Sequence, residues 1–320
     1  MTKIITITFN PALDKSVTIP ELVSEKKLKC SVPAYEPGGG GINVARAIKK
    51  LGGDATAVYL AGGYVGRKIT SLLEEEFVRS LVTETHEFSR ENLIVSDLAT
   101  GKQYLFDMKG PTIKEREWQE CLRSIEKIED VQYIVASGSL PEGVPADIFA
   151  RIAQIAREKN ARLIVDTSGE ALKHAIHEGV YLIKPNLREL GLLVGEENLT
   201  ADLARGIAGQ LTNTGKCEAI VVSLGSLGAL LVTREISLVV TPPALEAKST
   251  VGAGDSLVAG IVYSLAAGKE LSEAVKYGVA CGTAATINPG TELCKKSDAE
   301  KIYDSVQTKI SPIKQGSLVN

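Results

Sequence analysis

The stretch 249–268 joins a small-residue turn to an apolar helical pattern, and it holds a carboxylate in an unusual place. Gly252, Ala253 and Gly254 leave room for a ligand to contact the backbone. Their amide hydrogens lie at the predicted helix N-terminus, where unpaired donors and the helix dipole attract an anion. Asp255 would repel a bound phosphate unless it takes a proton from an incoming hydroxyl. The pattern indicates phosphoryl transfer, with an ordinary first-turn acid as the alternative.

A second glycine-rich turn, 36–43, opens another predicted helix that runs to Gly52. Four consecutive glycines allow the backbone to approach a polar ligand closely, although a flexible linker is the alternative. Asn43 can both donate and accept hydrogen bonds, which suits sugar hydroxyls. No Gly-Lys-Ser/Thr follows, so the turn is not a Walker A loop.

Two further polar positions follow predicted strands. Asp14 comes just after the strand 3–9, at the strand end where open α/β sheets place their ligands, although a turn aspartate is the alternative. Asn186 and Glu189 are three apart at the start of a predicted helix. Their oxygens suit a hydrated divalent cation, and a helix cap is at least as good an explanation.

Regular alternation of strands and helices predicts the elements that position these residues. Strands are expected at 3–9, 54–60, 133–137, 162–166, 181–184 and 219–223, with helices at 67–77, 113–129, 145–159, 169–178, 187–193 and 200–214. Repeated βαβ units predict a parallel sheet with helices on both faces and one ligand cleft along the strand ends. Short pieces at 16–19 and 29–35 and a hairpin at 91–96 and 102–107 predict a small separate sheet, with Arg90 at its start.

Composition excludes several classes of protein. The chain has 320 residues, 44% of them hydrophobic, and a net charge of 36 − 39 = −3, which argues against nucleic acid as a partner. Five scattered cysteines without a Cys-x-x-Cys pair argue against zinc and disulfides. The first residues form a strand pattern without the shape of a signal peptide, and the longest apolar stretch, 257–267, is too short for a membrane span. We therefore expect a reduced, cytoplasmic protein.

Together the motifs resemble the ribokinase-type carbohydrate kinases over nearly the whole chain. The turn 38–43 with its helix to Gly52, the stretch 250–255 and the pair Asn186 and Glu189 carry the resemblance. The chain is most similar to the sugar-phosphate branch, which includes the minor bacterial 6-phosphofructokinases, 1-phosphofructokinases and tagatose-6-phosphate kinases. The first of these is favoured by four stretches: 36–51, 137–141, 165–172 and 249–255.

The resemblance implies an α/β fold: a three-layer αβα sandwich with a mostly parallel central sheet and a small β-sheet lid. It implies one catalytic domain over 1–310, lid strands from about 15–36 and 90–108, and a C-terminal tail at 311–320. Lid strands in this family commonly pair between subunits, so a homodimer is expected. The partners implied are ATP and a sugar phosphate, with neither nucleic acid nor a membrane.

The resemblance also implies residue roles. Asp255 corresponds to the catalytic base and Gly252, Ala253 and Gly254 to an anion hole. The sugar hydroxyls would contact Asp14, Gly39, Gly40 and Asn43, and the sugar phosphate would contact Lys27, Arg90 and Ser139. The nucleotide would contact Lys184, Asn186, Ser223, Gly225, Gly228, Thr250, Gly252 and Gly254. Mg²⁺ would be held by Glu189 and Asn186, largely through water, and K⁺ by a loop of Ser249, Val251, Ala285, Asn288 and Gly290.

The activity so implied is ATP-dependent phosphorylation of the C1 hydroxyl of fructose 6-phosphate, a step of glycolysis. Tagatose-6-phosphate kinase and 1-phosphofructokinase activities remain alternatives, because no motif resolves the stereochemistry or the phosphate position of the sugar. A non-catalytic nucleotide or sugar-phosphate sensor is a different class, and the intact Asp255 argues against it. Val23 stands where the minor enzyme has an aromatic residue linked to inhibition by a second ATP. Allosteric inhibition by ATP is therefore not expected from the resemblance.

Overall fold

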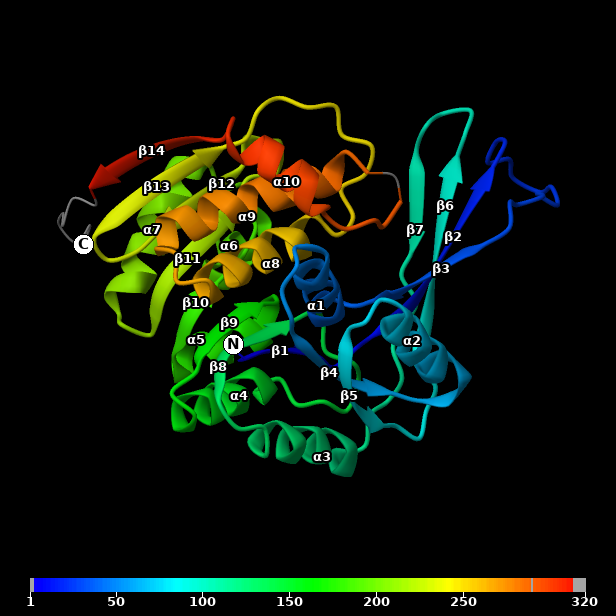
Figure 1. The fold of residues 1–320 in the computed structure, drawn as a ribbon, viewed down its shortest axis with the longest axis horizontal. Helices are drawn as coiled ribbons and strands as arrows, with labels where there is room; N and C mark the ends of the chain where they lie inside the picture. Colours follow the sequence, from blue (N-terminus) through cyan, green and yellow to red (C-terminus); the bar gives the residue numbers. More distant parts are fainter. Residues whose placement is uncertain (1–2, 289, 313–320) are drawn as a thin grey trace.

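Two sheets of unequal size organise the chain in the computed structural model, which describes residues 3–288 and 290–312 (Figure 1). The described residues form a ten-stranded sheet in the order β14-β13-β12-β11-β10-β9-β8-β1-β4-β5. Its strands are β1 Lys3–Thr8, β4 Thr56–Ala61, β5 Arg79–Glu84, β8 Val131–Ser137, β9 Arg162–Asp166, β10 Val180–Ile183, β11 Cys217–Ser223, β12 Ala229–Val232, β13 Ile236–Thr241 and β14 Gln307–Pro312.

The seven strands from β11 to β5 in this sheet are parallel, and their central members are buried on both faces. In β1, for example, every residue after Lys3 is buried, as near-continuous apolar runs in parallel strands predict. The predicted parallel sheet is therefore confirmed. Strand β5 and the antiparallel strands β12, β13 and β14 extend it at its two edges and were not predicted.

Helices cover both faces of the large sheet, which makes the expected three layers. They are α1 Gly40–Lys50, α2 Gly63–Glu75, α3 Glu115–Glu126, α4 Ile148–Glu158, α5 Gly169–Glu178, α6 Leu187–Val194, α7 Ala201–Asn213, α8 Ala253–Ala266, α9 Leu271–Thr286 and α10 Lys296–Tyr303. One apolar core joins α1, α2, α8, α9 and α10 to the sheet, and a second joins α3 to α7 to the other face. Helices α8 and α9 pack closely at glycines: a Cβ on Gly260 would lie 2.8 Å from the Cα of Gly278.

The second sheet, called here the small sheet, has four strands in the order β3-β2-β6-β7 and extends from one side of the molecule (Figure 1). Its strands are β2 Ala12–Ile19, β3 Ala34–Gly38, β6 Arg90–Asp97 and β7 Gln103–Phe106. The predicted hairpin is β6 with β7. Strand β2 runs parallel to β6, with Ala12 beside Arg90 near the body and Ile19 beside Asp97 at the outer end.

The C-terminal boundary differs from the prediction. Strand β14 pairs with β13 as far as Ser311 and Pro312, so these two residues belong to the large sheet and not to a tail beginning at 311. The rest of the predicted tail, 313–320, lies outside the described residues. Within the described part of the chain, no helix is both long and apolar enough to cross a bilayer.

Candidate active site

The N-terminus of α8 is built on a glycine turn. Gly252 caps the helix in the left-handed conformation, with φ of 75°, and a Cβ there would lie 2.8 Å from Cδ2 of Leu293. Both constraints require glycine. The helix that follows is buried from Ser256 to Val262, so its first turn is held firmly by the core. Asp255 lies in that first turn, beside backbone amides that an incoming anion can use.

The carboxylate of Asp255 is partly buried and contacts the other glycine-rich element. The side-chain amide of Asn43, in the first turn of α1, donates a 2.9 Å hydrogen bond to its Oδ2. Burial raises the pKa of Asp255 to about 6, and the negative charge of Asp166 adds to the rise, whereas the bond from Asn43 opposes it. A carboxyl group with a pKa near 6 is well suited to accept a proton at neutral pH.

Lys184 and Asp166 form an ion pair beside this carboxylate. Asp166 ends β9 and Lys184 directly follows the neighbouring strand β10, and Nζ of Lys184 lies 3.2 Å from Oδ1 of Asp166. Burial is the largest single effect on Lys184 and lowers its pKa, but the charge and hydrogen bond of Asp166, together with the charges of Glu189 and Asp255, outweigh burial and the pKa is raised. Lys184 was predicted at the site and Asp166 was not. The position of Asp166 at the end of a predicted strand, Arg162 to Asp166, was the available signal.

Asp14 lies on the small sheet and faces the same region. Asn92, its neighbour on β6, donates a 2.9 Å hydrogen bond to Oδ1 of Asp14. Burial raises the pKa of Asp14 to about 6, against the lowering effects of the Asn92 bond and the Arg90 charge. A Cβ on Gly38 would lie 2.3 Å from Oδ2 of Asp14, so the glycine makes room for this carboxylate.

The glycine loop packs tightly against the protein itself. A Cβ on Gly39 would lie 2.8 Å from Cγ2 of Thr8, and one on Gly40 would lie 2.2 Å from Oγ of Ser137. Gly39 also has φ of 111°, which disfavours other residues. These side-chain positions are therefore filled by the ends of β1 and β8 and not by open space for a ligand. The linker alternative is excluded, because the loop is fixed between two strands and α1.

A cavity of about 340 Å³ lies at the base of the small sheet. Its lining residues are Asn10, Arg90, Asp107, Met108, Lys109, Gly110, Ser139, Leu140, Pro141 and Glu142. Arg90 and Ser139 were both predicted to contact the sugar phosphate, and the structure brings them together in the lining of this cavity. The other polar lining residues were not predicted.

Arg90 is fixed in this cavity, and the described residues leave one of its hydrogen-bond donors unpaired. Its side chain is 10% exposed, and Nη1 donates to the carbonyl oxygen of Met108 at 3.0 Å and to the carboxylate of Asp107. Its buried Nε has no partner within the described residues. Ser139 accepts a 3.0 Å hydrogen bond from Asn10. A buried guanidinium with an unused donor and a nearby hydroxyl form a good anion site.

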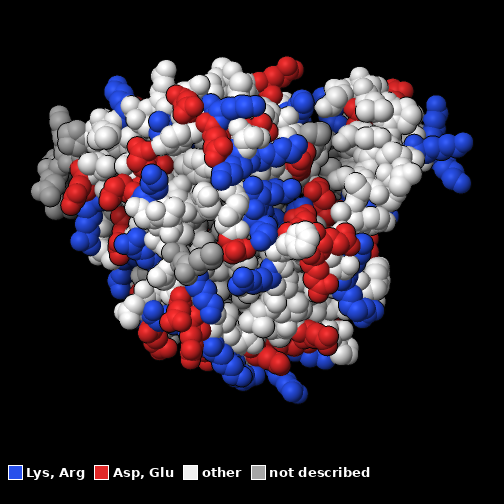
Figure 2. All heavy atoms as spheres, viewed as in Figure 1, with Lys and Arg blue, Asp and Glu red and all other residues white. Residues whose placement is uncertain are grey.

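Lys27 does not reach this cavity within one chain. It lies in the exposed loop that joins β2 to β3 beyond Ile19, at the end of the small sheet opposite to Arg90. Figure 2 shows Lys and Arg side chains gathered at this outer end. Within one chain, Lys27 and Arg90 therefore lie at opposite ends of the small sheet, and the prediction that both contact the sugar phosphate stays a prediction that requires a second chain.

The predicted magnesium pair forms a helix cap in this structure. The amide of Glu189 donates a 2.8 Å hydrogen bond to Oδ1 of Asn186, and the amide of Asn186 donates a 2.9 Å bond to Oε2 of Glu189. This capping box begins α6. Ser223 forms a bridge with Asn186, and the exposed turn at Gly225 follows. Of the predicted nucleotide residues, Lys184, Asn186 and Ser223 therefore lie at adjacent strand ends.

The two segments of the predicted cation loop are also brought together. Oγ of Ser249 donates a 2.6 Å hydrogen bond to the carbonyl oxygen of Gly290 and accepts one from the amide of Val251. Asn288 donates through its side chain to Ala284 and Leu293 and through its amide to Ala285. Among the described residues, no three His, Cys, Asp or Glu side chains form a metal-binding group.

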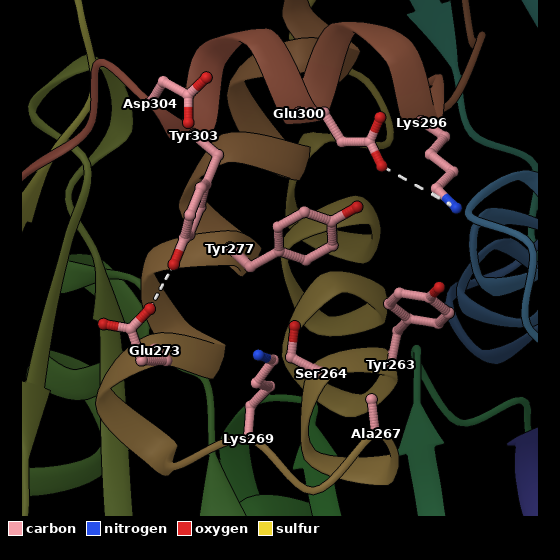
Figure 3. Close-up of a pocket in the computed structure, with 10 residues that line it drawn as sticks. All are labelled: Tyr263, Ser264, Ala267, Lys269, Glu273, Tyr277, Lys296, Glu300, Tyr303 and Asp304. Atoms are coloured by element: carbon pink, nitrogen blue, oxygen red, sulfur yellow. Dashed lines mark hydrogen bonds and ion pairs between the residues drawn. The ribbon is translucent and has the colours of Figure 1, made fainter.

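A second cavity, of about 440 Å³, lies between α8, α9 and α10 (Figure 3). Tyr263, Tyr277 and Tyr303 line it together with lysine and acidic side chains. It lies at the C-terminal end of α8, whereas Asp255 lies at the N-terminal end. None of the predicted site residues borders it, so it is separate from the candidate active site.

The sequence and the fold are both similar to those of known carbohydrate kinases. The pattern of the pfkB family carbohydrate kinases matches residues 7–298. ATP-dependent 6-phosphofructokinase isozyme 2 of Escherichia coli K12 is 44% identical over 95% of this chain and 98% of its own. The 1-phosphofructokinase of Bacillus subtilis 168 is 32% identical over 90% of this chain and 95% of its own. The crystal structure of Escherichia coli phosphofructokinase-2 in complex with potassium superimposes with a TM-score of 0.92, at 44% identity, over 95% of this chain and 99% of that one.

The family match spans most of the chain and includes both glycine-rich turns, the candidate base and the strand ends that surround it. The chain therefore belongs to the pfkB family of carbohydrate kinases.

Proposed function

We propose that this protein transfers the γ-phosphoryl group of ATP to the C1 hydroxyl of fructose 6-phosphate and yields fructose 1,6-bisphosphate. The observation that carries the proposal is the position of Asp255, a carboxylate with a raised pKa in the first turn of α8, bonded to Asn43. The relatives named ATP-dependent 6-phosphofructokinase, at 44% and 42% identity, support this choice of reaction. The proposed setting is cytoplasmic glycolysis.

In the proposed mechanism Asp255 accepts the proton of the sugar hydroxyl as that oxygen attacks the γ-phosphorus atom, and the bond from this phosphorus to the β,γ-bridging oxygen breaks and releases ADP. The pKa of about 6 keeps the carboxylate ionised at neutral pH while leaving it basic enough to take the proton. The backbone amides of Gly252, Ala253 and Gly254 stabilise the charge on the transferring group. Lys184, whose raised pKa keeps it protonated, adds a positive charge on the nucleotide side.

The sugar phosphate lies between Asp255 and the cavity at the base of the small sheet. Asp14 and Asn43, with the backbone of Gly39 and Gly40, orient the sugar hydroxyls. Arg90 and Ser139 bind the phosphate that the substrate already carries. Asp107, which now pairs with Arg90, is 76% exposed and can turn into solvent when the phosphate arrives.

Magnesium and potassium complete the proposed site. Asp166 ends β9, and Asn186 and Glu189 cap and begin α6 after the neighbouring strand β10. Their side-chain oxygens are hard ligands of the kind that a hydrated Mg²⁺ accepts. The ion supplies charge neutralisation of the phosphates of ATP. Carbonyl oxygens of the loop formed by Ser249, Val251, Ala285, Asn288 and Gly290 suit K⁺, and the potassium complex of the Escherichia coli relative supports this.

We also propose that two chains pair through their small sheets, which then act as a shared lid. The small sheet exposes large apolar side chains that a partner would cover: Tyr35, Leu105 and Phe106 on its strands and Val32 and Leu98 in its loops. Its basic outer end carries Lys27, which lies away from Arg90 of the same chain. In a pair of crossed lids, Lys27 reaches the phosphate cavity of the partner subunit.

One substrate panel tests this function. The purified protein is incubated with ATP, Mg²⁺ and, separately, fructose 6-phosphate, tagatose 6-phosphate and fructose 1-phosphate, and ADP release and the phosphorylated carbon are followed. The highest kcat/KM is expected for fructose 6-phosphate. A clear preference for fructose 1-phosphate would favour the activity of the Bacillus subtilis relative instead. ADP release at background level with every sugar would favour a sensor.

A further inference from the structure

Arg46 is a buried arginine next to the candidate base. Its side chain is 2% exposed, and it lies on α1 one turn after Asn43. Glu76 accepts two hydrogen bonds from it, at 2.8 and 2.6 Å, and Glu36 accepts one at 3.2 Å. Nη1 also donates to the carbonyl oxygen of Pro37 at 2.9 Å and, at 3.4 Å, to Oδ1 of Asn43. One guanidinium therefore joins α1, the end of α2 and strand β3.

The contact with Asn43 determines which way its amide faces. A guanidinium has only donors, so the group of Asn43 that faces Arg46 must be the oxygen. The amide nitrogen is then left to donate to Asp255, at 2.9 Å. If the amide turned over, its oxygen would face the carboxylate of Asp255 and repel it. The charge on Arg46 therefore favours the orientation in which the base is held by a donor.

The same guanidinium also contacts the small sheet, through strand β3. Glu36 and Pro37 belong to β3, and Glu36 pairs across the sheet with Asp14. The second carboxylate oxygen of Glu36 accepts a hydrogen bond from the hydroxyl of Thr291. A Cβ on Gly252 would lie 3.8 Å from the carbonyl oxygen of Thr291, so this loop lies beside the N-terminus of α8. Arg46 is thus linked to the base on two sides: directly through Asn43, and through Glu36 of β3 and Thr291 to the loop beside the N-terminus of α8.

We propose that Arg46 is a positioning residue that orients Asp255 through the side-chain amide of Asn43. Through Arg46, the geometry of the base then depends on whether the small sheet is docked. The proposal rests on the proposed role of Asp255 as the base. When β3 is docked, Glu36 and Pro37 hold Arg46 against Asn43, and the amide nitrogen is directed at Asp255. When β3 moves away, the guanidinium loses its contacts with Glu36 and Pro37, keeps its two bonds to Glu76, and is no longer held against Asn43 from the side of β3. Proton acceptance is thereby confined to the closed site.

A double-mutant cycle tests the route through Asn43. Lys cannot reproduce the guanidinium fork, so Arg46→Lys is expected to lower kcat about tenfold while the KM for ATP stays the same. In an Asn43→Ala background, where the amide is absent, the same Arg46→Lys change is expected to alter kcat by less than about threefold. Equal losses in both backgrounds would show that Arg46 only stabilises the fold, and would overturn the proposal.

Substitutions of Glu36 and Glu76, the two acidic partners of Arg46, test the proposal even if Arg46→Lys folds poorly. Glu76 makes the two shorter bonds, so Glu76→Gln is expected to lower Tm more than Glu36→Gln does. Glu36 provides the link to β3, so Glu36→Gln is expected to lower kcat more than Glu76→Gln does. If kcat fell in the same order as Tm, the dependence on the small sheet would be wrong.

Two further variants separate this inference from the proposed function. Arg151→Lys is a control outside the site, because Arg151 likewise donates two hydrogen bonds to an acid, Asp147, but lies on α4. Its kcat is expected to stay within about twofold of that of the unmodified enzyme. Asp255→Asn must abolish the activity if Asp255 is the base. An active Asp255→Asn variant contradicts the proposed role of Asp255 as the base, whereas an inactive one with an additive cycle contradicts only the role of Arg46.

Discussion

The side-chain amide of Asn43 donates to the carboxylate of Asp255 across 212 positions of sequence. Each residue lies in the first turn of a helix that a glycine turn opens, α1 in one case and α8 in the other. The contact therefore joins the element that follows the small sheet to the element that would bind the transferring phosphate. A phosphoryl-transfer site of this design assembles only when both glycine turns are correctly folded.

Replacing Arg90 tests whether the substrate already carries a phosphate. Arg90→Ala is expected to raise the KM for fructose 6-phosphate by about 10- to 100-fold, the loss of roughly 1.5–3 kcal/mol from a charged hydrogen bond. The KM for ATP should not change, because Arg90 lies in the cavity at the base of the small sheet. Arg79→Ala, on the edge strand β5, serves as the control. If the unmodified enzyme phosphorylated free fructose and fructose 6-phosphate with equal kcat/KM, the proposal that this cavity binds the substrate phosphate would be contradicted.

The pH dependence of the reaction follows from the two raised carboxyl pKa values. Asp255 and Asp14 both have a pKa of about 6, and both act in the ionised form. The value of kcat/KM is therefore expected to rise with pH through an apparent pKa near 6 and to level off above about pH 7, the two groups titrating as a coupled pair. Initial rates between pH 5 and 8 measure this. A profile that is flat down to pH 5 would mean that neither carboxylate must be ionised.

The raised pKa of Asp14 also predicts a cost in stability. The pKa is about 6 in the folded protein and 3.8 for a free side chain, so the folded state binds the proton more tightly. Stability then falls as pH rises from about 4 to 6, and the penalty is fully present above that range. Asp14→Asn should therefore raise Tm at pH 8, by about 2–4 °C for each 1 kcal/mol recovered, and should raise it less at pH 5. A larger gain at pH 5 would contradict the assignment.

Mixed dimers test whether Lys27 serves the partner subunit. Lys27→Ala and Arg90→Ala should each be impaired alone. When the two variants are mixed and allowed to exchange subunits, one site in each mixed dimer combines an intact Arg90 with an intact Lys27 from the other chain. Random exchange is then expected to restore about a quarter of the native activity. Activity that stays at the level of the separate variants would show that the two cations do not meet across the subunits.

The alternation of strands and helices was predictable because it depends on local periodicity. Strand β9 and helix α5 match the predicted ranges 162–166 and 169–178. The edge strands β5, β12, β13 and β14 were missed, since their position depends on pairing with distant segments. The glycine turns were predicted correctly as turns that open helices, α1 and α8, but the space beside Gly39 and Gly40 proved to be filled by strands β1 and β8.

The site was predictable where one residue type in one place has a clear chemical use, as for Asp255. It was not predictable where partners are far apart in sequence. Arg46 meets Glu76 across 30 positions, and nothing near Arg46 in the sequence marks it as buried. The pair Asn186 and Glu189 illustrates a different difficulty, because one spacing serves both a helix cap and a cation site. Only coordinates show that the cap is formed.

Replacement of Asp255 tests the central claim most directly. Asp255→Asn keeps the shape of the side chain and removes its basicity, so kcat with fructose 6-phosphate is expected to fall by about 10³- to 10⁴-fold. Asp54→Asn, an exposed acid paired with Lys49, is the control and should keep full activity. ATP binding, measured by calorimetry on the same samples, should be unchanged. A loss of kcat of less than about tenfold would contradict the account and assign the base to another residue.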